Sequence, residues 1–213
     1  MPLPRFEKLP EDKQERILEA AARVFTANRY EKASLNLMLE EAGISKGAAY
    51  YYFADKADLV ATLVRHYWLD SLVQRGTTFS ELTADTYWET VADLYQHPLT
   101  DVEERPWLLG LSRSLWELPH DLLKSGPLKG VAEEAADWMA ALLQRGRELG
   151  LVRNDLPDDL LIRLIWTLDG VHDKWLGSHW TNTDGNERER ITRVFVSFLR
   201  KILEPPTDGE EAA

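Results

Sequence analysis

Residues 34–56 read SLNLMLEEAGISKGAAYYYFADK, and this stretch decides how the N-terminal part of the chain folds. Ser34 and Ser45 are residues that favour helix N-caps, and each precedes a short segment with apolar side chains at helical spacing. Gly43 lies between these segments, and glycine readily takes the left-handed conformation that a tight turn needs. Together with a longer helix that begins after Pro10, the stretch predicts a helix-turn-helix unit.

The second short helix has a composition typical of DNA recognition. It begins with Ser45, Lys46, Gly47 and Ala48, whose small side chains let a backbone approach base edges while one lysine reaches guanine or phosphate. Three tyrosines follow at 50–52, and neighbouring residues of a helix point about 100° apart, so one core cannot bury all three. We therefore expect at least one hydroxyl to face outward and donate to a phosphate oxygen.

Each of these assignments has a purely structural alternative. Capping alone explains Ser34 and Ser45 as well as DNA contact does. Tyr52 could pack in the core, and Lys46 could be an ordinary solvated lysine. A helical hairpin that does not bind DNA is the corresponding alternative for the whole motif.

Residues 12–65 resemble the DNA-binding region of the TetR family of bacterial repressors. The resemblance is carried by Phe25, Tyr30, Ser34, Glu41, Ala42, Gly43, Ile44, Ser45, Gly47, Tyr50, Tyr52, Phe53, Lys56 and Leu59. It implies DNA contacts from Ser34, Asn36, Ser45, Lys46, Gly47, Ala48, Tyr50, Tyr51, Tyr52 and Lys56. The sequence departs from the family pattern at Arg29, Leu39 and Ala49. Residues 150–159 and 168–170 resemble the approach to the family's last two helices, which usually build a dimer interface.

The charge of the chain permits DNA binding without arguing for it. The formal net charge is −11, but residues 1–60 carry nine Lys/Arg and ten Asp/Glu, whereas residues 61–213 carry sixteen and twenty-six. Local positive charge is enough for a DNA-binding face, because electrostatic steering acts over about a Debye length. The chain contains no cysteine, its N-terminus lacks the apolar stretch of a secretory signal, and no run is apolar enough to span a membrane. We expect a cytoplasmic protein.

The remainder of the chain predicts an all-α fold. Beyond a fourth helix that starts near Asp55, helical periodicity appears at 81–96, 103–118, 128–150, 157–178 and 186–203, and no segment alternates like a strand. The predicted domains are a helix-turn-helix DNA-binding domain at 1–55, a larger helical ligand-binding and dimerisation domain at 56–204, and a disordered acidic tail at 205–213.

An aromatic excess suggests a ligand pocket in the larger domain, because all eight tryptophans follow residue 65. Ordinary core packing is the alternative for any one of them. Asp169, His172 and Asp173 fall within one helical turn, a spacing that offers few metal ligands, so solvent pairing or a polar contact to a ligand is expected instead. The ligand-binding candidates are Trp88, Trp107, Leu111, Trp116, Trp138, Leu142, Trp166, Asp169 and Asp173. No metal and no cofactor are predicted.

The last two helices are candidates for a homodimer interface. The helix at 157–178 is apolar on two faces, so each face needs a packing partner. One partner is its own domain, and the other could be a second subunit. The candidate interface residues are Ile162, Trp166, Gly170, Val194, Phe195, Phe198 and Ile202.

The function predicted from these features is a ligand-responsive DNA-binding regulator. The family resemblance favours a repressor released from a near-palindromic operator by a small, largely apolar or aromatic effector. A helical ligand-binding or scaffold protein without DNA binding is the first alternative. An enzyme is the second, although the sequence has no nucleophile elbow, phosphate loop, metalloprotease motif or dinucleotide fingerprint.

Overall fold

The computed structural model describes residues 2–28, 30–70, 79–119 and 121–206. None of these residues lies in a β-strand. The chain forms two compact units. Unit 1 contains residues 1–74 and 106–135, and unit 2 contains residues 75–105 and 136–213. Arg29, Leu72 and most of the acidic tail lie outside the described residues.

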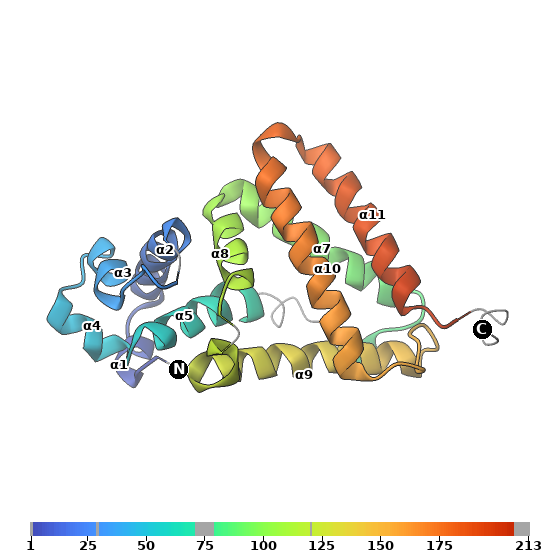
Figure 1. The fold of residues 1–213 in the computed structure, drawn as a ribbon, viewed down its shortest axis with the longest axis horizontal. Helices are drawn as coiled ribbons and strands as arrows, with labels where there is room; N and C mark the ends of the chain where they lie inside the picture. The colour runs from blue at the N-terminus through green and yellow to red at the C-terminus, as the bar shows by residue number, and fades with distance from the viewer. Residues whose placement is uncertain (1, 29, 71–78, 120, 207–213) are drawn as a thin grey trace. The chain divides into compact units, whose positions relative to one another are not determined.

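Unit 1 contains the helix-turn-helix and the helices that pack on it (Figure 1). Its helices are α1 (Pro4–Glu7), α2 (Glu11–Ala27), α3 (Leu35–Glu41), α4 (Lys46–Tyr52), α5 (Lys56–Val64) and α8 (Trp107–Trp116), with the π-helical segment η1 (Arg65–Leu69), the 3-10 turn η3 (Leu122–Lys124) and the first part of α9 (Gly126–Glu148). The long helix α2 packs against α3 and α8.

The core of unit 1 is built on one apolar face of α2. Ile17, Ala21 and Phe25 are at most 2% exposed. The predicted cap of α5 is also formed, because Asp55 accepts a hydrogen bond from the Asp58 N–H at 2.8 Å and the Asp58 carboxylate accepts one from the Ala54 N–H at 3.0 Å.

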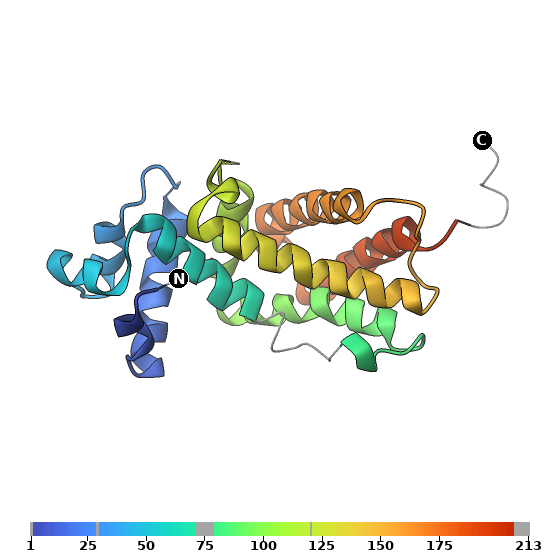
Figure 2. The ribbon, with the colours of Figure 1, turned by 90° about the horizontal axis from the view of Figure 1, so that it is seen from below.

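Unit 2 contains η2 (Phe79–Glu81), α7 (Tyr87–Glu104), the second part of α9, α10 (Asp158–His179), η4 (Trp180–Asn182) and α11 (Gly185–Leu203). α10 and α11 form an antiparallel pair (Figure 1), and α11 also packs along α7. Figure 2 shows α9 as one continuous helix. The close approach of α7 to α9 depends on Gly146, where a Cβ would meet the Tyr87 hydroxyl at 2.6 Å.

Two helix boundaries differ from the sequence-based expectation. The helical patterns at 81–96 and 103–118 left residues 97–102 outside a helix, yet α7 runs through Pro98 to Glu104. Burial of Leu99 and Val102 beyond the proline offsets the lost backbone hydrogen bond. The segment before residue 10 was not expected to be helical, but Pro4 starts α1 just as a proline in the first turn commonly does.

None of the described helices combines the length and the apolar character needed to cross a membrane.

Candidate functional site

The turn between α3 and α4 has the geometry of a glycine-terminated helix end. Gly43 has φ +74°, its N–H donates to the Glu40 carbonyl at 2.9 Å, and the Ile44 N–H donates to the Leu39 carbonyl at 2.9 Å. These two bonds satisfy the carbonyls at the end of α3 and are the pattern of a Schellman motif. Gly43 therefore fixes the angle at which α4 leaves α3.

Both serines predicted as caps do cap their helices. The Ser34 hydroxyl accepts from the Leu37 N–H at 3.1 Å, and the Ser45 hydroxyl accepts from the Ala48 N–H at 3.4 Å. Both residues are exposed, so capping does not remove them from contact with a partner. The Asn36 side-chain oxygen, in contrast, is buried and has no hydrogen-bond partner.

Helix α4 divides into a buried and an exposed side. Ala49 is fully buried, as is Phe53 just beyond the helix. Lys46 and Gly47 are exposed, and Ala48 is half-buried. A Cβ on Gly47 would meet no atom of the protein within 4 Å, so nothing in the fold itself requires glycine there.

The three tyrosines have different environments, as the helical geometry predicts. Tyr50 is 54% exposed and Tyr51 is 55% exposed. Tyr52 is half-buried, with its ring 6.4 Å from that of Phe6. The first two are therefore available to an external partner, and Tyr52 contributes to packing.

Lys56 is engaged within unit 1. Its ammonium donates to the Tyr30 carbonyl at 2.6 Å and lies 4.0 Å from the centre of the Tyr30 ring. This pair fastens the start of α5 to the loop before α3. A phosphate contact by Lys56 would use the ammonium N–H groups that do not donate to the Tyr30 carbonyl.

The sequence reasoning did not anticipate the role of α1. Phe6 is 2% exposed, and its ring centre lies 4.9 Å from that of Phe53, so α1 covers the end of α4. The available signal was Leu3-Pro4, the same helix-start pattern as Leu9-Pro10.

The nine candidate ligand residues do not all belong to one unit. Trp107, Leu111 and Trp116 are in unit 1, where the Trp107 ring lies 4.9 Å from that of Tyr67. The other six are in unit 2. Four of these form or line its apolar core, namely Trp88, Trp138, Leu142 and Trp166.

Asp169 belongs to a polar cluster inside unit 2. The Tyr95 hydroxyl on α7 donates to the Asp169 carboxylate at 2.8 Å. On α10, His172 is 8% exposed, stacks on Phe195 of α11 at 4.3 Å, and lies 3.3 Å from the Thr192 hydroxyl.

Burial raises the pKa of Asp169 to about 7, the Tyr95 hydrogen bond opposes this rise, and the Asp173 charge adds to it. Burial also raises the pKa of the Tyr95 hydroxyl, with a further contribution from the Asp169 charge. Asp169 is therefore a carboxyl group that can donate a hydrogen bond at neutral pH.

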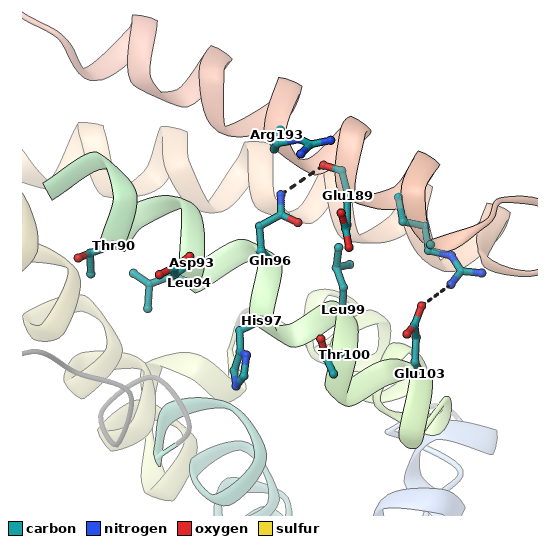
Figure 3. A pocket seen from close by; sticks show the side chains of 12 residues that line it. Thr90, Asp93, Leu94, Gln96, His97, Leu99, Thr100, Glu103, Glu189 and Arg193 are labelled. Atoms are coloured by element: carbon teal, nitrogen blue, oxygen red, sulfur yellow. Dashed lines mark hydrogen bonds and ion pairs between the residues drawn. The ribbon is translucent and has the colours of Figure 1, made fainter. Parts of the chain in front are cut away.

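An open cavity of about 740 Å³ lies between α7 and α11 (Figure 3). Most of its lining residues are polar or charged, and they include an Arg188–Glu103 ion pair at 3.2 Å and a hydrogen bond of 3.2 Å from the Gln96 side chain to the Glu189 carbonyl. None of the nine candidate ligand residues lines it; the lining residues are Thr90, Asp93, Leu94, Gln96, His97, Leu99, Thr100, Glu103, Gly185, Arg188, Glu189 and Arg193.

The candidate interface residues of α10 do not face outward as a group. Ile162 is 7% exposed and packs in the unit 2 core, Gly170 is buried, and Trp166 is half-buried against that core. The exposed apolar residues of α10 lie on its other face: Leu160, Leu164, Val171 and Trp175. On α11, Val194 and Phe198 are exposed as expected, while Phe195 and Ile202 are half-buried.

Comparison with known proteins identifies the motif. Residues 17–63 match the family model described as bacterial regulatory proteins, tetR family. The chain is 30% identical over 192 residues to the HTH-type transcriptional repressor AcnR of Corynebacterium diphtheriae, covering 88% of this chain and 92% of that protein.

Solved structures share the fold. The fatty acid degradation regulator FadR from Bacillus halodurans superposes with a TM-score of 0.71 at 18% identity, over 96% of this chain and 99% of that one. FadR from Bacillus subtilis, solved in complex with stearoyl-CoA, gives 0.70 at 16% identity, over 87% and 96%. The chain, with its capped helix-turn-helix and all-helical fold, therefore belongs to the TetR family of DNA-binding transcriptional regulators.

Proposed function

We propose that this protein is a cytoplasmic, homodimeric repressor that binds a near-palindromic operator and is released by a small, largely apolar or aromatic effector. The observation that carries the DNA-binding part is the exposed side of α4. Lys46, Gly47, Tyr50 and Tyr51 face solvent there, and none of them is needed to fill the core.

The proposed reading of DNA follows from this surface. Gly47 and Ala48 let the start of α4 approach the base edges in the major groove, and Lys46 reaches a guanine or a phosphate. Ser34, which caps α3, Asn36 on α3, and Tyr50 and Tyr51 on α4 contact the DNA backbone on either side. Ser45, Tyr52 and Lys56 support the geometry through capping and packing, with any DNA contact secondary to that role.

For the homodimer, we propose the exposed apolar stripe of α10 and α11 as the interface. Leu164, Val171 and Trp175 share one exposed face of α10, and Val194 and Phe198 share one exposed face of α11. Single exposed apolar residues are common on protein surfaces, but several on one face of each of two neighbouring helices favour an interface. In this dimer the two α4 helices, one from each subunit, bind successive major grooves of one operator.

The effector part of the proposal is supported by the similar FadR of Bacillus subtilis, whose bound stearoyl-CoA carries a long apolar chain. In this protein the aromatic residues Trp88, Trp138 and Trp166 gather in unit 2, with the Asp169 carboxyl as a polar neighbour on α10. An effector acts by binding the free and the operator-bound state with different affinity.

The test begins with duplex DNA selected from a random pool by the wild-type protein. Lys46→Ala is expected to weaken binding to the selected duplex roughly tenfold, through loss of a charge-assisted contact. Lys129→Ala, which removes an exposed cation of α9 outside the proposed DNA and dimer surfaces, is the matched control and is expected to bind normally. Selection of no DNA by the wild type, or equal losses in both variants, contradicts the proposal.

A further inference from the structure

The N-terminal segment brings a cation to the exposed side of the recognition helix. The Arg5 guanidinium carbon, on α1, lies 4.4 Å from the centre of the Tyr51 ring on α4. Both side chains are exposed. Tyr51 follows Gly47 by four residues, so the two share one face of α4. Arg5 therefore lies beside the surface that is proposed to approach DNA.

The position of Arg5 is fixed by packing rather than left to a loose terminus. Phe6, its neighbour in sequence, is 2% exposed and contacts the Phe53 ring at 4.9 Å. The Leu3 N–H donates to the Tyr52 carbonyl at 2.9 Å, and the Gln14 side chain donates to the Leu9 carbonyl at 2.8 Å. The core and backbone of unit 1 thus hold α1 on both sides of Arg5.

The contact with the Tyr51 ring leaves the hydrogen-bonding capacity of Arg5 available. A guanidinium group uses its flat face to contact an aromatic ring, while its five N–H groups point outward in its own plane. Phosphate oxygens accept hydrogen bonds in that plane, often two at once. The Tyr51 ring therefore orients the group and does not compete with a phosphate for its donors.

We infer that Arg5 contacts a DNA backbone phosphate and that Tyr51 is its positioning residue, so that the DNA-binding surface extends from the helix-turn-helix onto α1. The inference rests on the proposed binding of DNA by α4. A guanidinium at this place adds affinity without reading bases, because phosphates are the same at every sequence.

The main experiment compares wild type and Arg5→Ala on a duplex that the wild type selects from a random pool, with affinity measured over a series of salt concentrations. Arg5→Ala is expected to bind roughly tenfold more weakly at low salt, equally for selected and unrelated duplexes. The slope of log affinity against log salt is expected to fall by about one for each half-site. Thermal unfolding is expected to be unchanged, because the Arg5 side chain is exposed.

Arg23→Ala is the matched control. It removes another exposed arginine of unit 1, whose guanidinium pairs with Glu19 at 2.6 Å on α2. This variant is expected to keep both the affinity and the salt slope of the wild type.

The positioning role of Tyr51 is tested by repeating the Arg5→Ala change in two backgrounds. In Tyr51→Phe the ring remains, so loss of Arg5 is expected to weaken binding as much as in the wild type. In Tyr51→Ala the guanidinium has no ring to lie on, so loss of Arg5 is expected to weaken binding less. Equal losses in the two backgrounds overturn the role of Tyr51.

Two further outcomes separate this inference from the proposed function. If Arg5→Ala keeps the wild-type affinity and slope while Lys46→Ala binds weakly, the phosphate contact is overturned and DNA binding by α4 stands. If Arg23→Ala loses as much as Arg5→Ala, the effect is one of general charge and the inference is again overturned. A wild-type protein that selects no DNA overturns both.

Discussion

At the scale of the residue, Asp169 makes the stability of the protein depend on pH. The folded environment raises its pKa to about 7 from an ordinary value of 3.8, mainly through burial. Between these two values the unfolded chain releases a proton that the folded protein retains. Because ionisation favours the unfolded chain in this window, Asp169 makes the free energy of unfolding fall as pH rises from about 4 to about 7.

Asp169→Asn is expected to remove that part of the pH dependence. An amide oxygen still accepts the hydrogen bond from Tyr95, but it cannot ionise. The variant is expected to gain stability over the wild type as pH rises from 4 to 7, by at most about 4 kcal/mol. Urea unfolding at a series of pH values measures this. Asp137→Asn, at an exposed position of α9, is the control, and parallel curves for wild type and Asp169→Asn would count against the argument.

At the scale of the element, α4 contains a glycine that its own stability does not favour. Glycine in a helix costs roughly 0.5–1 kcal/mol relative to alanine. Gly47 lies in the first turn of α4, where a Cβ would meet no atom of the protein within 4 Å. The proposed approach of DNA to α4 accounts for the glycine.

Gly47→Ala is therefore expected to raise the free energy of unfolding by about 0.5 kcal/mol and to lower DNA affinity by an order of magnitude or more, because a methyl group would stand between the helix and the base edges. Thermal unfolding and titration of the selected duplex measure the two effects. Gly130→Ala is matched to it, since Gly130 is also helical with open space at its Cβ. Normal DNA affinity in the Gly47 variant would refute this role for α4.

At the scale of the whole molecule, the exposed apolar stripe of α10 and α11 is the feature that the single chain does not explain. Val171 is 64% exposed and Phe198 is 58% exposed. Phe198→Asp places an unpaired charge in the proposed interface and is expected to weaken dimerisation roughly a hundredfold or more. Sedimentation at micromolar concentration measures the oligomeric state. Ser197→Asp, about 100° away around α11, is the control, and a Phe198→Asp protein that remains dimeric would exclude this interface.

The sequence by itself determined what short-range interactions control. The caps at Ser34 and Ser45, the turn at Gly43 and the cap at Asp55 each depend on bonds between residues three to five apart, so their residue types are readable in order along the chain. The helical period in turn predicted the all-α fold, and the spacing of residues 12–65 predicted the family.

Only the tertiary structure decided which apolar face of a helix becomes core. α10 has two such faces, and periodicity treats Ile162 and Leu164 alike; packing in unit 2 buries the first and leaves the second exposed. Likewise, Pro98 remains helical because Leu99 and Val102 gain burial, and Arg5 meets Tyr51 because Phe6 packs on Phe53. The physical reason is the same throughout: burial depends on partners that are distant in sequence, and no local pattern specifies which partners they are.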